Sequence, residues 1–159
     1  MHDVGFYLIV AVVAFSLAFD FINGFHDTAN AIATSVTTRA IPPEKAVLMA
    51  ATLNFVGALV STGVAKTIGG DIIKSPDLIN QEVILAALIS AILWNLLTWK
   101  MGIPSSSSHT LIGGLMGAAV MHQGIDILKM SGIIRIIASL ILSPLIALGG
   151  GSVIMIMLL

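Results

Sequence analysis

Long uncharged stretches alternate with short polar connections along this chain. The uncharged stretches cover residues 4–19, 46–65, 83–99, 101–125 and 136–159. A helix that crosses the hydrocarbon core of a bilayer needs roughly 20 mostly apolar residues, and most of these stretches reach or approach that length. The pattern therefore predicts four spanning helices, at residues 4–22, 46–66, 83–100 and 136–157.

Two segments differ from an ordinary span. Residues 28–38 are too few to cross a bilayer alone, and residues 101–125 are interrupted by Gly102, Pro104 and four consecutive serines. Short or broken segments at membrane depth are tolerated only inside protein or beside a cavity. We therefore expect two half-membrane or re-entrant segments, with Gly24 as a candidate break in the helix before the first of them.

The composition supports this membrane architecture. Hydrophobic residues make up 57% of the chain and charged residues only 9%, whereas a soluble domain carries about a quarter charged residues. The net charge of −1 leaves no basic surface for nucleic acid, and the absence of cysteine removes disulfides and thiolate sites. We therefore expect an all-α integral membrane protein, with residues 1–159 as a single membrane domain. We expect it to be a multi-pass protein of the cell membrane, in contact with the lipid bilayer.

Five polar residues recur at helical spacing in and after the first predicted span. Steps of 3, 4, 3 and 4 positions place them on one face of a helix: Asp20, Asn23, Asp27, Asn30 and Thr34. Their oxygens suit a hard cation such as Na⁺ or Mg²⁺, or a shared proton. An ionisable residue inside a membrane segment costs at least about 2.5–3.5 kcal/mol, which favours a functional role. The alternative is that Asp20 and Asp27 lie at the membrane interface and face water.

A second polar cluster lies in the interrupted stretch, at residues 102–110. Proline followed by serines is a helix-start signal, because Ser105 or Ser106 can cap the helix while the next backbone amides stay free. Such helix starts bind anions, and in transporters they point at anionic substrate groups near the midplane. The alternative is an ordinary polar loop. The glycines that follow are expected to allow close helix packing: Gly113, Gly114 and Gly117.

Three further polar residues fall inside predicted helices. His26 lies off the face shared by the first cluster, and we expect it to pack or to reach the headgroups. Asn95 is expected to form an interhelical hydrogen bond, worth about 0.6–2 kcal/mol. For Asn54, a structural hydrogen bond and a place on a substrate path are equally supported.

Neither polar cluster, at residues 20–34 or 102–117, contains a lysine or an arginine. An anion site without a fixed cation must rely on helix dipoles, amides, hydroxyls and a co-bound cation. The acidic helix face can hold that cation, so that the two ions enter together and each lowers the burial cost of the other. The residues alone thus lead to ion-coupled symport as a hypothesis.

Two ordered blocks, at residues 20–38 and 94–117, resemble those of a known family. Gly-Phe-His-Asp-Thr-Ala-Asn-Ala at residues 24–31 is similar to the Gly-Ala-Asn-Asp-Val-Ala-Asn signature of the inorganic phosphate transporter family. His26 stands where that signature has the asparagine before the aspartate. Residues 94–99 and 102–109 resemble the second block of the family.

The resemblance implies a phosphate symporter, driven by Na⁺ or H⁺, that works by alternating access and is not an enzyme. It places Asp27 and Asn30 at the cation site, as Na⁺ ligands if sodium is the coupling ion. Asp20, Asn23 and Thr34 share their helix face and are candidates for the same site. No cofactor besides the coupling ion is expected. Phosphate would be surrounded by hydroxyls: Ser105, Ser106, Ser107, Ser108 and Thr110.

Members of this family have two inverted halves, each with a version of both blocks. This chain carries one version of each block and resembles an N-terminal half. The expected partners are therefore inorganic phosphate and a second inverted half. That half would be a separate chain, a second copy of this chain or the rest of a longer protein.

Three alternatives stay open. A serine of residues 105–108 could act with His109 or His122 as the nucleophile of an intramembrane hydrolase. Against this, Ser108 and His109 would point to different helix faces, and no Gly-x-Ser-x-Gly motif surrounds the serines. A passive anion channel would carry phosphate regardless of Na⁺ or a pH gradient, and a purely structural membrane subunit would bind no phosphate.

Overall fold

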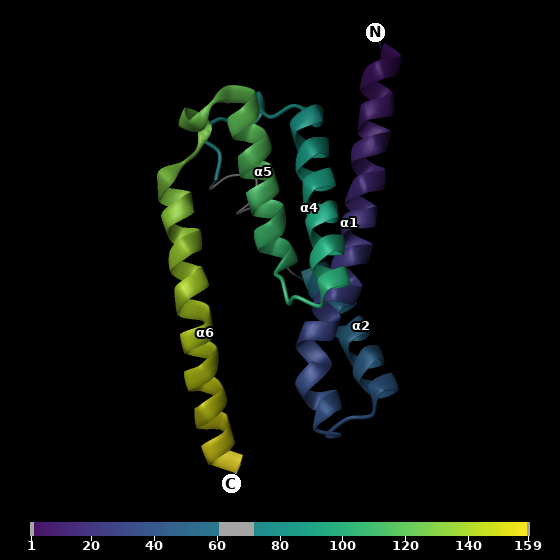
Figure 1. Cartoon of the computed structure of the whole chain (residues 1–159), viewed down its shortest axis with the longest axis vertical. Helices are drawn as coiled ribbons and strands as arrows, with labels where there is room; N and C mark the ends of the chain where they lie inside the picture. The colour runs from purple at the N-terminus through teal and green to yellow at the C-terminus, as the bar shows by residue number, and fades with distance from the viewer. Residues whose placement is uncertain (1, 61–71, 159) are drawn as a thin grey trace.

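The described part of the chain is built from helices. The computed structural model describes residues 2–60 and 72–158, and Figure 1 shows the elements in order. They are α1 (His2–Thr37), α2 (Pro43–Val60), the 3₁₀-helix η1 (Pro76–Leu78), α4 (Gln81–Met101), α5 (Ser107–Gln123), the 3₁₀-helix η2 (Ile125–Ile127) and α6 (Met130–Leu158). Among these residues, four helices are long and apolar enough to cross a membrane: α1, α2, α4 and α6. The all-α membrane class and the four spans are confirmed, although residues 61–66 of the predicted second span lie outside the described residues.

Helix α1 is longer than a single span. It runs without a break for 36 residues, which corresponds to about 54 Å at a rise of 1.5 Å per residue. Residues 28–38 therefore do not form the separate half-membrane segment that we expected, because they are the end of α1 and the turn after it. Glycine, unlike proline, retains its backbone N–H, so Gly24 lowers helix propensity by about 1 kcal/mol without ending the helix. The chain turns only at Arg39, whose φ is 59°, just before Pro42 and Pro43.

Helices α4 and α5 form an antiparallel hairpin. Helix α4 ends at Gly102, which adopts the left-handed conformation (φ 67°) and donates its N–H to the Trp99 carbonyl at 3.1 Å. After residues 103–106, α5 begins at Ser107 and returns along α4. In Figure 1 the connecting turn is level with the middle of α6 rather than with either end of that helix. The predicted interruption of the stretch at residues 101–125 is therefore confirmed.

Gly114 sets the spacing within this hairpin. A Cβ atom on Gly114 would lie 2.8 Å from the carbonyl oxygen of Ala87 and 2.8 Å from Ser90 Oγ. Helix α5 thus approaches α4 so closely that only glycine fits. A Cβ atom on Gly113 or Gly117 would meet no atom of residues 2–60 or 72–158 within 4 Å. The prediction of close packing is confirmed at Gly114 and is wrong for the other two glycines.

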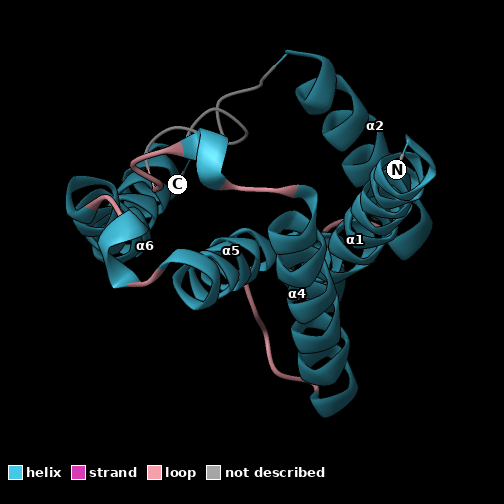
Figure 2. Ribbon diagram, turned by 90° about the horizontal axis from the view of Figure 1, so that it is seen from above, coloured by secondary structure: helices cyan, strands magenta, loops and turns pink. Residues whose placement is uncertain are grey.

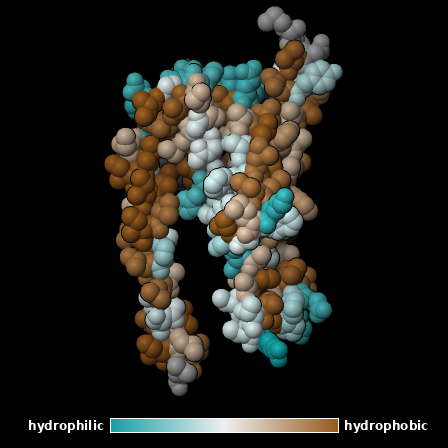
Figure 3. All heavy atoms as spheres, viewed as in Figure 1, coloured by the Kyte–Doolittle hydropathy of each residue, from teal (hydrophilic) through white to brown (hydrophobic). Residues whose placement is uncertain are grey.

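Helices α1, α4 and α5 meet in a small apolar core, which we call the three-helix core. Its buried members are Phe19 on α1 and Leu88 and Ala91 on α4, and Leu111 of α5 packs against them. Figure 2 shows the three helices side by side, with α4 between α5 and α1. By contrast, α2 and α6 expose most of their apolar side chains, and brown surface follows α6 in Figure 3. Exposed apolar helices of this kind suit contact with lipid or with further membrane helices.

Candidate functional site

The two polar clusters of the sequence meet where α5 begins. The Ser107 hydroxyl donates to Asp27 Oδ2 at 2.6 Å and also lies within hydrogen-bond distance of Asn23 Oδ1. Ser107 is completely buried, while Asn23 and Asp27 are half-buried. One turn further along α1, Asn30 Nδ2 donates to the carbonyl oxygen of Ser105 at 3.4 Å. The structure therefore brings three of the predicted α1 residues against the serine run.

Ser107, Asn23 and Asp27 form a group of three oxygen atoms, which we call the oxygen cluster. A serine hydroxyl has one hydrogen, so Ser107 Oγ donates to only one of its two neighbours at a time. An ionised carboxylate and an amide oxygen have no hydrogen to contribute. The cluster therefore holds more acceptors than donors. Carboxylate, amide and hydroxyl oxygens in this balance suit a small hard cation.

Ser106 caps the first turn of α5. Its Oγ accepts from the backbone N–H of His109 at 3.4 Å and lies 2.7 Å from His109 Nδ1. Thr110 Oγ1 donates to the Ser106 carbonyl at 2.9 Å. Of the two serines that the sequence offered as a cap, Ser106 has this role. The first backbone amides of a helix have no intrahelical partner, so this start offers N–H groups and hydroxyls to an anion.

The remaining predicted site residues lie apart from this contact. Asp20, Thr34 and Ser108 are exposed. In residues 2–60 and 72–158, no hydrogen bond joins the side chain of Asp20 or Thr34 to the serine run. Asn54 is exposed on α2. The roles expected for these side chains remain predictions.

Two buried polar side chains were not predicted as part of the site. His26 on α1 is 5% exposed and Asn95 on α4 is fully buried. Within the described part of the chain, His26 Nδ1 and both polar side-chain atoms of Asn95 lack a hydrogen-bond partner. The interhelical hydrogen bond predicted for Asn95 is therefore wrong, and His26 packs inside instead of reaching the headgroups. Spacing is the signal that could have shown this burial, because His26 follows Phe19, and Asn95 follows Leu88, by seven positions.

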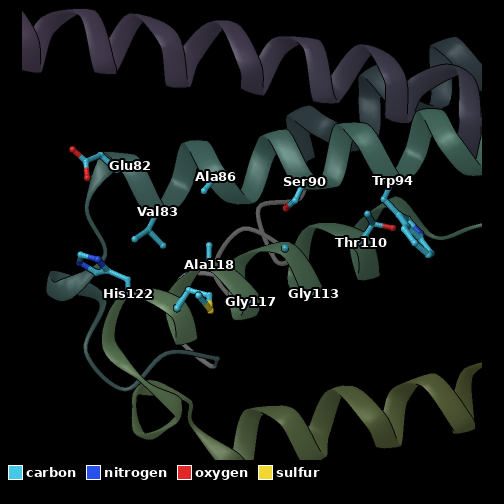
Figure 4. Close-up of a pocket in the computed structure, with 12 residues that line it drawn as sticks. Glu82, Val83, Ala86, Ser90, Trp94, Thr110, Gly113, Gly117, Ala118 and His122 are labelled. Carbon is cyan, nitrogen blue, oxygen red and sulfur yellow. The ribbon is translucent and has the colours of Figure 1, made fainter.

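An open groove of about 820 Å³ runs along the α4–α5 hairpin. Figure 4 shows Glu82 and His122 at one end of this groove and Thr110 and Trp94 near the other. Between these two ends the groove is lined mainly by small residues: Ala86, Ser90, Gly113, Gly117 and Ala118. Because Thr110 belongs to the first turn of α5, the groove ends beside the capped helix start.

The fold and the site together define a class of protein. Membrane-spanning helices bring side-chain oxygens of α1 against a capped helix start, an arrangement that is found in membrane transporters for small ions. The chain belongs to the phosphate transporter family, whose model matches residues 23–159. The resemblance drawn from the two sequence blocks is thereby confirmed.

Several transporters are similar to this chain. A probable low-affinity inorganic phosphate transporter of Bacillus subtilis (strain 168) is 58% identical over 146 residues, which cover 91% of this chain and 44% of that protein. The low-affinity inorganic phosphate transporter PitA of Escherichia coli (strain K12) is 38% identical, over 89% of this chain and 31% of that protein. A solved structure, the sodium-dependent phosphate transporter, matches with a TM-score of 0.76 at 32% identity, over 89% of this chain and 39% of that one. The chain thus spans less than half the length of these relatives, and their class agrees with the prediction that it is not an enzyme.

Proposed function

We propose that this chain supplies one half of a cation-coupled phosphate symporter of the cell membrane, with Na⁺ as the coupling ion. The observation that carries the proposal is the oxygen cluster, in which Ser107 at the helix start touches both Asn23 and Asp27 of α1. The structural relative is a sodium-dependent phosphate transporter, which supports Na⁺ over H⁺.

The cation binds at the oxygen cluster. Asp27 supplies a full negative charge there, and Asn23 and Ser107 supply neutral oxygens. A charged side chain inside a membrane segment costs at least about 2.5–3.5 kcal/mol. A monovalent cation about 4 Å from the carboxylate contributes an attractive interaction of about 4 kcal/mol at an effective dielectric constant of 20. The two magnitudes are similar, so binding of the cation offsets the burial cost of the carboxylate.

Phosphate binds at the start of α5. The hydroxyls of Ser105, Ser106, Ser108 and Thr110 and the first backbone amides belong to this helix start, and residues 102–117 contain no lysine or arginine. A helix N-terminus carries the equivalent of only about half a positive charge. The missing charge comes from the cation, because Ser107 belongs both to the first turn of α5 and to the oxygen cluster. Each ion then raises the affinity for the other, which is the basis of coupling.

A second inverted half completes the transporter. This chain covers 44% of the Bacillus subtilis relative, so the rest of that protein is long enough to hold a further half of similar size. The exposed apolar faces of α2 and α6 are available to pack against it. We propose that this half is a separate chain, a second copy or the rest of a longer protein. Alternating access then occurs by movement of one half against the other.

Uptake of labelled phosphate into vesicles that contain this chain tests the proposal. We expect uptake that requires an inward Na⁺ gradient, that is abolished by Asp27→Asn, and that is retained by Asp126→Asn. The latter makes the same change at an exposed residue of η2. Uptake that is indifferent to Na⁺ would overturn symport in favour of a passive channel. No uptake by correctly inserted protein would show that copies of this chain do not complete the transporter on their own.

A further inference from the structure

One turn beyond the three-helix core, all three helices carry a polar residue on the face that forms the core. Each of these residues lies four positions from a core residue of its own helix: Asn23, Asn95 and Ser107. Because an α-helix has 3.6 residues per turn, positions four apart share a face and lie one turn apart. Asn95 therefore lies in the same layer of the α1–α4–α5 contact as two members of the oxygen cluster.

The contacts on either side of this layer fix the register. On one side, Gly114 of α5 lies against Ala87 of α4. Ser107 is seven positions from Gly114 and Asn95 is eight positions from Ala87, both in the direction of the connecting turn, so the two residues lie at a similar height in the hairpin. On the other side, the rings of Phe25 on α1 and Trp99 on α4 are in contact, with their centroids 5.6 Å apart. The three helices thus stay together through the layer that contains Asn95.

Asn95 is buried in this layer without a partner. Its exposure is 0%, and within residues 2–60 and 72–158 neither its amide oxygen nor its amide nitrogen has a hydrogen bond. Thr98, one turn further along α4, is also buried, but its hydroxyl bonds to the carbonyls of Trp94 at 3.0 Å and Asn95 at 3.1 Å. Buried polar groups normally have partners, and leaving one unpaired is destabilising. The unpaired amide therefore distinguishes Asn95 from its buried polar neighbour and indicates a function.

We infer that the amide oxygen of Asn95 is a ligand of the coupling cation, together with the oxygen cluster. This inference rests on the proposed sodium-coupled function and adds a third helix to the site. Without Asn95, the side-chain oxygens of the site come from α1 and α5 alone. With it, α4 also contributes, so the cation is held where the α4–α5 hairpin meets α1. Cation binding then fixes the hairpin against α1.

Sodium-dependent stabilisation of the purified full chain tests this role. The melting temperature is followed in detergent while NaCl replaces choline chloride at constant ionic strength. Asn95→Leu keeps a similar side-chain volume and removes the oxygen. We expect it to raise the sodium concentration needed for half-maximal stabilisation by about tenfold or more, as for loss of a group that supports a metal site. Thr98→Val is the matched control, because among the described residues its buried hydroxyl bonds only to its own helix, and the midpoint should not change.

A second variant keeps the inference testable if Asn95→Leu does not fold. Asn95→Asp retains an oxygen ligand and adds a negative charge, so the sodium midpoint should fall below that of the wild type. An unchanged midpoint in Asn95→Asp, or in folded Asn95→Leu, would overturn the ligand role and leave the proposed function intact. A wild-type chain that sodium does not stabilise would instead overturn the proposed sodium coupling, and the role of Asn95 with it.

Discussion

Replacing Gly114 with alanine tests the closest contact between α4 and α5. The new methyl group would lie 2.8 Å from Ser90 Oγ and 2.8 Å from the Ala87 carbonyl oxygen. The Ser90 side chain can rotate away, although it would lose its 2.9 Å hydrogen bond to the same carbonyl. The Ala87 carbonyl belongs to the backbone of α4 and cannot move without the helix. The substitution therefore forces the two helices of the hairpin apart.

The size of the effect follows from two opposing terms. Forcing an extra carbon into a well-packed contact costs about 1–3 kcal/mol, while alanine in place of glycine gains up to about 1 kcal/mol of helix propensity. Gly117→Ala makes the same change three positions further along α5, where the methyl group meets nothing within 4 Å in the described part of the chain. It keeps the propensity gain without the clash. Gly114→Ala should therefore be less stable than Gly117→Ala by about 1–3 kcal/mol.

Unfolding in mixed micelles of rising SDS content measures this difference. The only two tryptophans of the chain, Trp94 and Trp99, both lie on α4 and report on the hairpin by fluorescence. The wild type and the two alanine variants are compared under identical conditions. Equal stability of the two variants, or greater stability of Gly114→Ala, would refute the close approach of α5 to α4.

Two further predictions concern the start of α5. Ser106→Ala removes the N-cap and should lower the free energy of unfolding by about 0.5–2 kcal/mol, while Ser106→Gly should cost only a few tenths. Equal losses in the same SDS titration would contradict the capping role. Ser107→Ala removes the hydroxyl that touches both Asn23 and Asp27, so it should reduce gradient-driven phosphate uptake more than Ser108→Ala, whose side chain is exposed. A larger defect in Ser108→Ala would place the important hydroxyl elsewhere.

The hairpin and its cap could be predicted from the sequence because their signals are local. Gly102 ends α4 in a conformation that favours glycine, and Pro104 with the serines after it marks the next helix start. The expected break in α1 was wrong because a single glycine, Gly24, is too weak a signal to end a helix. A change of helix direction needs a lost backbone hydrogen bond or a left-handed residue, as at Arg39.

The contacts between helices could be predicted only in part. The spacing of Asn23, Asp27 and Asn30 showed that they share a face, but it did not show that Ser107 would meet that face. The environment of Asn95 depends on its register with Ser107 across the hairpin, and this register is set by Gly114 against α4. The spacing from Leu88 could have shown that Asn95 is buried, but nothing in the neighbouring residues carries its register with Ser107, so its lack of a partner became visible only in three dimensions.

The length of α1 makes the thickness of the membrane relevant to the site. The hydrocarbon core of a bilayer is about 30 Å thick, and Asp27 lies about 38 Å along the helix from His2. A helix of this length must tilt, protrude or stretch the surrounding lipid, and hydrophobic mismatch decides among these responses. The depth of Asp27 in the bilayer therefore depends on the acyl chains around α1. Lipid chain length becomes a means of changing how easily water reaches the proposed ion site, without altering any residue of the protein.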